Sequence, residues 1–307
     1  MSSSQPAPVV SIVSVAHNAR AGLLRGLGAI QSGTEVPAEM IVVDNGSTDN
    51  TAAAVRHAFR DVTLIRQDEP LPAPAALNLG AASARAPWLL FLDPGLEPVG
   101  DAVRTLLEHA GSHPDERLCT GRTLRDGVDD GRTVEAAPSL LGTACLALSL
   151  PFDPERLPRL DRSIGGAVPA LTPRMLLIER DLWDMLGGFD ERLPTADLSV
   201  RARALGARPT LVPDARMTAN PPSPRPARLV STALLTERMA FAHRHLTPGR
   251  TRAMGLILSV AALARSVAGE PWRSIRRRRS TWLSSQAPMP FVAVQTRSFV
   301  RRDLPQP

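Results

Sequence analysis

The sequence predicts an α/β fold in which helices flank a mostly parallel sheet. Short β-branched runs alternate along the chain with segments whose apolar residues recur at helical spacing. These runs lack the alternation of a half-exposed strand, so we expect them to be buried on both faces. Two of them stop at turn sequences, DNG in one case and DPG in the other. A β-α-β-α order of this kind is typical of a parallel sheet.

The first two strand–helix pairs are marked by residue type and spacing. Val9–Val15 is a β-branched run, and Ala19–Ile30 repeats Leu and Ala at helical spacing. Met40–Val43 is a second β-branched run that ends at Asp44-Asn45-Gly46, and the amphipathic segment Thr51–Phe59 follows this turn. We therefore expect strand, helix, strand and helix in that order.

The next elements repeat the pattern and indicate where a ligand would bind. Val62–Ile65 is expected to be a strand, Ala75–Ala84 a helix and Trp88–Leu92 a strand that stops just before Asp93. Ligands of open parallel sheets bind beyond the carboxyl ends of the strands. The strand ends near Val15, Asp44 and Asp93 are therefore expected to face one crevice.

Glycine-rich turns divide the second half of this domain. Asp126–Arg132 is rich in Gly and Asp and is expected to be an exposed turn. Gly187-Gly188 should end one helix, while Thr195 can cap the next, which Gly206 would close. The other expected elements are helices Asp101–Ala110, Arg180–Leu186 and Ala196–Leu205 and strands Leu176–Ile178 and Thr210–Val212, the last of which stops before Pro213.

A stiff proline-rich stretch between residues 221 and 226 separates a C-terminal segment from this domain. Helices are expected there at Leu229–His245 and Ala253–Ala268. The second is apolar but shorter than the roughly 20 residues that span a bilayer. With the arginine run Arg276–Arg279 it resembles an interfacial anchor, although a core helix beside a solvated charge run explains the same pattern. The expected divisions are a flexible tail at 1–8, the α/β domain at 9–220, a helical basic segment at 221–283 with possible membrane contact through 253–279, and a loose tail at 284–307.

Composition limits the class of protein. Hydrophobic residues make up 43% and charged residues 21%, a balance that excludes a disordered chain. The net charge is +6, and because the sequence contains no lysine its strong bases are all arginines, which suit phosphate and anionic surfaces. A coding bias toward arginine is the alternative explanation. Aromatic residues make up only 4% and no nucleic-acid motif is recognised, so we expect no nucleic-acid binding.

Cysteine usage and the N-terminal residues indicate the compartment. Cys119 and Cys145 show neither metal-ligand spacing nor a disulfide framework, which favours a reducing compartment. Met1–Pro8 lacks the basic-then-apolar order of a secretory signal. We therefore expect a cytoplasmic protein, peripheral to the membrane if its C-terminal segment is an anchor.

Several segments resemble a known family. They are Val9–Asn18 (VVSIVSVAHN), Ile41–Thr51 (IVVDNGSTDNT), Ala75–Ala84 (AALNLGAASA), Phe91–Pro98 (FLDPGLEP), Met175–Arg192 (MLLIERDLWDMLGGFDER) and Asp197–Arg203 (DLSVRAR). They resemble the family 2 glycosyltransferases, especially the rhamnosyltransferase branch, over most of residues 9–216. The resemblance implies the Rossmann-like GT-A fold. It also implies an inverting enzyme that moves a sugar from a nucleoside diphosphate donor to a hydroxyl of a cell-envelope or lipid-linked glycan.

The resemblance assigns residues to the nucleotide-sugar donor. Asp44 would contact the base or ribose, because a carboxylate at a strand end accepts hydrogen bonds from N–H or hydroxyl groups. His17 replaces an aromatic residue usual in the family and is not expected to be catalytic. An Asx-type turn with helix caps at Asp44, Ser47 and Asp49 would explain the same cluster without a ligand. The residues expected to bind the nucleotide sugar are Asn18, Asp44, Asn45, Ser47, Asn78 and Asp93.

A divalent metal, Mg²⁺ or Mn²⁺, is implied at Asp93. This residue matches the first acid of the family's Asp-x-Asp, which holds the ion against the pyrophosphate, whereas Gly95 replaces the second acid. One carboxylate with two phosphate oxygens makes a thin shell for a hard cation, to which Glu97 could add. The alternative is that Asp93-Pro94-Gly95 is only a turn.

The acceptor side departs furthest from the family. After GGFDER the family has a pair of acids, a spacer and another acid before leucine, whereas here Leu193-Pro194-Thr195-Ala196 leads straight to Asp197. An inverting transferase needs a carboxylate to take the proton of the acceptor hydroxyl, and Asp197 is expected to serve. An acid in the first turn of a helix is also favoured by the helix dipole alone. Gly188, Asp190 and Glu191 are the other residues expected on this side.

These departures leave two functions open. The motifs on the nucleotide side favour an active glycosyltransferase. The changes at Gly95 and before Asp197 favour a catalytically degenerate protein that binds nucleotide sugars or serves as a scaffold. Turnover of nucleotide sugars would separate the two.

Overall fold

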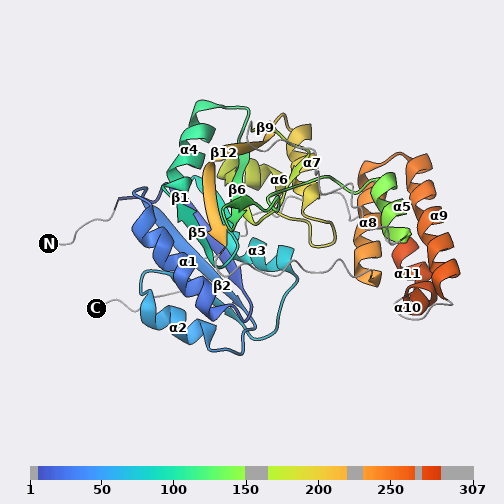
Figure 1. The fold of residues 1–307 in the computed structure, drawn as a ribbon, viewed down its shortest axis with the longest axis horizontal. Helices are drawn as coiled ribbons and strands as arrows, with labels where there is room; N and C mark the ends of the chain where they lie inside the picture. Colours follow the sequence, from blue (N-terminus) through green and yellow to red (C-terminus); the bar gives the residue numbers. More distant parts are fainter. Residues whose placement is uncertain (1–5, 149–164, 220–230, 267–271, 285–307) are drawn as a thin grey trace, which may run out of the picture.

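A computed structural model of the chain describes residues 6–148, 165–219, 231–266 and 272–284. The expected proline-rich boundary, most of the expected tail at 284–307 and residues 1–5 of the N-terminal tail lie outside these ranges. Figure 1 shows an α/β body with a separate group of helices at one side.

The central sheet holds ten strands within the described residues, eight of them on one path. From edge to edge these eight are β3 (Thr63–Gln67), β2 (Ala38–Asn45), β1 (Val10–Ala16), β4 (Trp88–Leu92), β11 (Met175–Glu179), β6 (Leu118–Arg125), β12 (Pro209–Ala219) and β5 (Leu96–Val99). β3, β2, β1 and β4 are mutually parallel, and β6 and β12 are parallel to each other. β11 runs antiparallel to both of its neighbours and β5 antiparallel to β12. The expectation of a mostly parallel sheet flanked by helices is confirmed.

Helices cover both faces of this sheet. Alternate strand residues point to opposite faces, so Val13 and Phe91 pack on one face while Ile12 and Leu90 pack on the other. The first face is covered by α3 (Ala73–Ala82), α6 (Arg180–Leu186) and α7 (Ala196–Ala204). The second is covered by α1 (Arg20–Gly33), α2 (Thr51–Ala58) and α4 (Ala102–Ser112). Each of these helices, and strands β1, β2, β3, β4 and β11, lies within a few residues of its predicted position.

Two strands of the eight-strand path and one helix of eight residues are among the elements that were not predicted. β6 and β5 contain polar residues, glycine or proline and do not form an apolar run. Gly121 in β6 is required because a Cβ there would lie 2.1 Å from the carbonyl oxygen of Ala215 in the neighbouring strand. α5 (Leu140–Ala147) is uniformly apolar and short, so periodicity alone does not distinguish it from a strand.

Two local predictions were wrong. Strand β12 does not stop before Pro213 but continues to Ala219, with a shift of register against β6 between Leu211 and Arg216. Proline is tolerated in a strand at such irregularities. Thr195 does not cap α7, because its own backbone is helical and its hydroxyl donates to Glu135 instead, at 3.2 Å from Oε1.

The expected turns at Gly187-Gly188 and Gly206 are confirmed, whereas the expected exposed turn Asp126–Arg132 is confirmed only at its tip, because it contains strand β7 (Val128–Asp129) and the Asp130 side chain is 4% exposed. Asp126 and Gly127 both have positive φ at the tip between β6 and β7. Gly187 and Gly188 adopt φ values of 68° and 79° at the end of α6, and Gly206 adopts 82° after α7.

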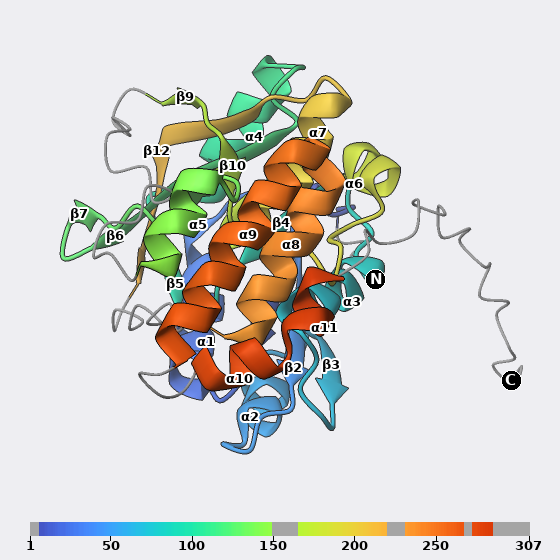
Figure 2. The same ribbon diagram turned by 90° about the vertical axis from the view of Figure 1, so that its right-hand side faces the viewer.

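The C-terminal helices form a separate packed group. It comprises α8 (Thr232–His245), α9 (Pro248–Arg265), α10 (Trp272–Arg277) and α11 (Arg279–Leu283). α5 also belongs to it and lies beside α9, as Figure 2 shows. Their shared core includes Met239, Leu258 and Trp282. None of the helices that the structure describes is long and apolar enough to cross a membrane.

Candidate active site

The loops after β1 and β2 are tied together by their side chains. The Asn18 backbone N–H donates to Ser47 Oγ at 3.0 Å, and the Thr48 N–H donates to Asn18 Oδ1 at 2.8 Å. Asn18 adopts φ of 50°, a left-handed conformation that asparagine tolerates better than most residues. Asn18 and Ser47 therefore shape the rim of the sheet by binding each other's loops.

Asp49 braces the same rim. It accepts hydrogen bonds from the backbone N–H groups of Arg20 and Thr51, which begin α1 and α2. The Thr51 hydroxyl also donates to this carboxylate and is the main reason that the pKa of Asp49 lies below its usual value. The capping role considered for Asp49 is confirmed by these contacts.

Asp44 and Asn45 end strand β2 at this rim. Asp44 is 1% exposed, and its Oδ1 accepts the Ser47 N–H at 3.2 Å. Asn45 exchanges two hydrogen bonds with the backbone of Leu71, at 2.9 and 2.7 Å. The Asn45 amide is thus committed to fixing the loop that leads into α3.

Asn78 links α3 to the glycine turn after α6. Its amide exchanges two hydrogen bonds, each of 2.9 Å, with the backbone of Phe189. A Cβ at Gly188 would lie 2.7 Å from Asn78 Oδ1 and 3.0 Å from the Trp183 ring, so only glycine fits. The donor side and the acceptor side of the predicted site are therefore held in contact by Asn78.

Asp93 follows strand β4, next to β1, so it lies at the same edge of the sheet as Asn18 and Asp44. Its Oδ2 accepts from Arg174 Nη1 at 3.1 Å. Although 46% of the Asp93 side chain is exposed, the protein crowds around the carboxyl. This desolvation raises its pKa, against the opposing charges of Arg174 and Arg132 and with the help of the Asp130 charge.

The residues around Asp93 do not form the two-carboxylate site of Asp-x-Asp enzymes. Gly95 adopts φ of 85°, and a Cβ on it would lie 3.2 Å from the Gly22 Cα of α1, which leaves little space for a side chain. Glu97 lies in β5 and pairs with Arg25 at 3.4 Å. Asp93 itself is occupied by the Arg174 guanidinium. The Asp-x-Asp positions offer a divalent ion one carboxylate, and that carboxylate already binds a cation.

Asp197 lies in the first turn of α7 and is buried, with 2% of its side chain exposed. Its Oδ2 accepts from Arg201 Nε at 2.6 Å, and its Oδ1 is 2.5 Å from His245 Nε2. Burial raises the pKa of Asp197, but the His245 hydrogen bond and the charges of Arg201 and Arg244 outweigh it, so the pKa lies below its usual value.

The other acceptor-side residues surround this cluster. Arg201 also donates to the carbonyl oxygens of Leu186 and Gly188, at 2.7 and 2.9 Å, and so joins Asp197 to the glycine turn. Asp190 Oδ2 pairs with Arg244 Nη1 at 2.9 Å. Glu191 is exposed. The predicted acceptor side is thus joined to α8 of the C-terminal group through Arg244 and His245.

Sequence reasoning missed two residues of this region. Arg174 immediately precedes β11 and the segment Met175–Arg192 that resembles the family, and a lone arginine there gives no signal of its partner. Glu135, in the short strand β8 (Val134–Glu135), accepts from Thr195 at the start of α7. No element was predicted around Glu135, so only the fold could reveal this proximity.

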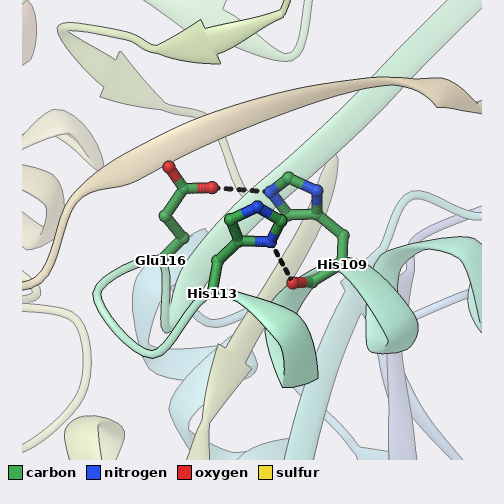
Figure 3. A group of neighbouring side chains, drawn as sticks. All are labelled: His109, His113 and Glu116. Atoms are coloured by element: carbon green, nitrogen blue, oxygen red, sulfur yellow. Dashed lines mark hydrogen bonds and ion pairs between the residues drawn. The ribbon is translucent and has the colours of Figure 1, made fainter.

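A separate set of side chains of metal-ligating types lies near the amino ends of β4 and β6, at the other end of the strands from Asp93. His109, His113 and Glu116 present ligand atoms within 4.8 Å of one another. Figure 3 shows the stacked histidine rings and the Glu116 carboxylate directed at His109, whose Nε2 is 2.6 Å from it. Glu116 precedes β6 at the level of Ile178, which pairs with Leu89 near the amino end of β4. This set is therefore distant from Asp93. The close pair of His109 and Glu116 also accounts for the arrangement without a bound ion.

The family of the chain is indicated by comparison with known proteins. A family model described as Glycosyl transferase family 2 matches residues 11–182. The chain is 29% identical over 237 residues to N-acetylglucosaminyl-diphospho-decaprenol L-rhamnosyltransferase of Mycobacterium tuberculosis, covering 68% of this chain and 75% of that protein.

Solved structures share the fold at low sequence identity. One is the mannosyltransferase PcManGT from Pyrobaculum calidifontis in complex with GDP-Man and Mn²⁺, with a TM-score of 0.53 and 17% identity over 91% of this chain and 85% of that one. Another is S. aureus TarS in complex with UDP, with a TM-score of 0.52 and 16% identity over 90% of this chain and 78% of that one. The similarity confirms the architecture expected from the sequence.

Proposed function

The chain belongs to glycosyltransferase family 2, and from this premise we propose that it is an inverting transferase acting on a nucleoside diphosphate sugar. Its acceptor would be a hydroxyl of a lipid-linked or cell-envelope glycan. The observation that carries the proposal is the meeting of Asn18, Asp44 and Asp93 at the carboxyl ends of three adjacent parallel strands. Such an edge is where open α/β sheets bind nucleotides.

The donor side supports nucleotide binding through a preformed rim. Asp44 and the loop of Ser47 would receive the base and ribose, with Asn18 fixing the shape of that loop. Asn45 and Asn78 have both amide groups engaged with backbone, so we assign them a positioning role in donor binding. A rim whose hydrogen bonds are already made loses little conformational freedom on binding.

The reaction requires one bond to form and one to break at the sugar C1. The acceptor oxygen attacks C1, the bond from C1 to the diphosphate oxygen breaks, and its electron pair leaves with the diphosphate. A carboxylate takes the acceptor proton. We keep Asp197 for this role, on the condition that His245 releases Oδ1 when the acceptor binds, because the carboxylate is otherwise fully engaged.

Glu135 is a second candidate for the proton acceptor. It is less buried than Asp197, and the hydroxyl of Thr195 at the start of α7 holds its Oε1. The backbone between Asp130 and Glu135 runs from the Arg174 cluster to α7, so Glu135 is joined to the donor side by a short segment.

We further propose that the C-terminal group rests on an anionic membrane surface, where a lipid-linked acceptor would lie. Leu256, Val260 and Leu263 are 65%, 57% and 58% exposed on α9, at a spacing that places them on one face. Exposed arginines of 276–279 lie in the adjoining α10 and α11. An apolar stripe beside arginines matches an interfacial helix on acidic lipid, with roughly 1 kcal/mol per arginine. This placement corresponds to the cytoplasmic membrane face expected from the sequence.

Membrane binding is testable by co-sedimentation with vesicles of mixed neutral and acidic phospholipids. Replacing Leu256, Val260 and Leu263 together by Ser should abolish binding. Leu205→Ser, at a residue of similar exposure (51%) beyond α7, is the matched control and should leave it unchanged. Equal binding by all three proteins would refute the membrane contact.

The transferase itself is tested by consumption of UDP-, GDP- and dTDP-sugars, with and without a polyprenyl diphosphate sugar acceptor. Turnover of one donor supports the proposal. The alternative is a degenerate family member that binds nucleotide sugars or scaffolds a partner. Nucleotide binding without turnover of any donor would favour that alternative.

A further inference from the structure

Arg174 occupies a position fixed by the sheet. It precedes β11, and its carbonyl oxygen accepts the Asp93 N–H at 2.8 Å, which extends the pairing of β11 with β4 by one step. Its side chain is 8% exposed. The guanidinium contacts Asp93 through Nη1 at 3.1 Å and Asp130 through Nη2 at 3.4 Å. A single cation thus bridges two carboxylates at the expected diphosphate position.

The Arg174 guanidinium has unused donors. Among the described residues, its Nε and Nη2 atoms are buried and make no hydrogen bond. Asp130 Oδ1 is engaged by other donors, since it accepts from the Thr123 hydroxyl at 2.5 Å and from the Arg132 N–H at 3.0 Å. Buried donors without acceptors are unfavourable, and phosphate oxygens match the planar fork of arginine.

The charges around Arg174 reproduce those of a metal site. The charges of two carboxylates and one divalent ion sum to zero. The charges of this cluster also sum to zero, because Asp93 and Asp130 are negative while Arg174 and the nearby Arg132 are positive. The site therefore offers a diphosphate a cation of comparable local charge without an ion, and both carboxylates that an ion would need already pair with Arg174.

We propose that Arg174 binds the diphosphate of the donor in place of a divalent metal ion, with Arg132 beside it. The proposal rests on the proposed function, since it assumes a nucleoside diphosphate ligand. Asp93 and Asp130 hold the guanidinium in position. As the sugar leaves, the same guanidinium neutralises the charge that develops on the diphosphate oxygen.

The test is calorimetric binding of UDP, GDP and dTDP to the full chain, in excess EDTA and in Mn²⁺. His113→Ala serves as the background, so that Mn²⁺ bound at the His109 set cannot contribute. We expect one nucleotide to bind equally under both conditions. Arg174→Met should weaken nucleotide binding in EDTA by roughly tenfold or more. Mn²⁺ should restore part of this affinity, because Asp93 and Asp130 no longer pair with Arg174 and can bind the ion.

Two further variants keep the test decisive. Arg174→Lys retains the charge, so that it preserves the fold if Arg174→Met does not, but loses the fork. It should bind more weakly while remaining insensitive to EDTA. Arg85→Met removes the same charge at an exposed site and should bind like the parent protein.

The outcomes separate this inference from the proposed function. Nucleotide binding by the parent protein only in Mn²⁺ would overturn the role of Arg174 and leave the transferase proposal standing. Parent-like binding by both Arg174 variants in EDTA would do the same. Binding of none of the three nucleotides under either condition would overturn both proposals.

Discussion

Asp93 and Asp197 are both aspartates paired with arginine, yet their surroundings give them opposite properties. Asp93 lies at a strand end with 46% of its side chain exposed, and burial of its surroundings raises its pKa. Asp197 lies in a helix with 2% of its side chain exposed and contacts His245, Arg201 and Arg244, and its pKa is lowered. The first carboxylate is half-exposed although it pairs with Arg174. The second is closed until its neighbours move.

The difference follows from what each pair is attached to. Arg174 reaches Asp93 along the sheet, and its Nε and Nη2 are buried without a hydrogen bond to any described residue. Arg201 and His245 reach Asp197 from α7 and α8. Arg201 also donates hydrogen bonds to the turn after α6. The donor side therefore offers unused hydrogen-bonding capacity, whereas the acceptor side uses its capacity to join the two parts of the molecule.

The largest effect is expected from removing the Asp197 charge. Asp197→Asn leaves Arg201, Arg244 and His245 without their common anion, and breaking a buried pair lowers the free energy of unfolding by about 3–5 kcal/mol. The matched variant Asp93→Asn, in a half-exposed pair, should change it by about 1 kcal/mol or less. Urea unfolding followed by circular dichroism measures both. Equal losses of unfolding free energy in the two variants would contradict the difference in surroundings between Asp93 and Asp197.

The proton acceptor is expected to show in turnover. If Asp197 takes the proton, kcat of Asp197→Asn should fall about 10²–10⁴-fold after correction for the folded fraction, while Glu135→Gln stays within a few-fold of wild type. Single-turnover rates with the best donor provide the measurement. The reverse order would transfer the role to Glu135 and leave Asp197 a purely structural residue.

A smaller effect is expected in the turn that joins the two sides. Gly188→Ala places a Cβ against Asn78 Oδ1 and the Trp183 ring at a positive φ, which should destabilise the protein by about 1–3 kcal/mol. Thermal unfolding measures the loss. Gly127→Ala, also at positive φ but with no atom near its Cβ, is the control and isolates the backbone strain. If both variants lose the same stability, the turn is not tightly packed.

The smallest effect concerns pH, where the two carboxyls should act in opposite directions. The folded pKa of Asp197 is below 3.8, so its contribution to stability is present above 3.8 and is lost as pH falls through the folded value. The folded pKa of Asp93 is above 3.8, so its contribution is present below 3.8 and is lost as pH rises through the folded value.

Urea midpoints at a series of pH values check these signs. The stability gap between wild type and Asp197→Asn should narrow as the solution is made more acidic than the unfolded pKa of 3.8. Asp93→Asn should gain stability relative to wild type as pH rises past the raised pKa of Asp93. If the difference in stability from wild type changed in the same direction with pH for both variants, the surroundings assigned to Asp93 and Asp197 would be contradicted.

The sequence was sufficient for the donor half of the sheet and insufficient for the rest. β1, β2 and β4 are continuous apolar runs, so their ends placed Asn18, Asp44 and Asp93 at one edge. β6 and β5 interrupt that pattern with Gly121 and with proline, because close approach to a neighbouring strand and an edge position governed those residues. Pattern reasoning identifies strands buried on both faces more readily than these.

Candidate site residues followed the same division. Asn18, Asp44 and Asp93 could be inferred because strand ends position them locally. The partners of Asp93 and Asp197 could not, because Arg174 and His245 lie 81 and 48 residues away in sequence and meet them only in the fold. The prediction of Thr195 as a cap failed because its hydroxyl binds Glu135, a contact over 60 residues.

A crystal structure of the chain with its preferred nucleoside diphosphate tests the central claim most directly. We predict that the base and ribose lie beside Asn18 and Asp44 and that diphosphate oxygens accept hydrogen bonds from the Arg174 guanidinium. A nucleotide bound away from the ends of β1, β2 and β4 would contradict the account.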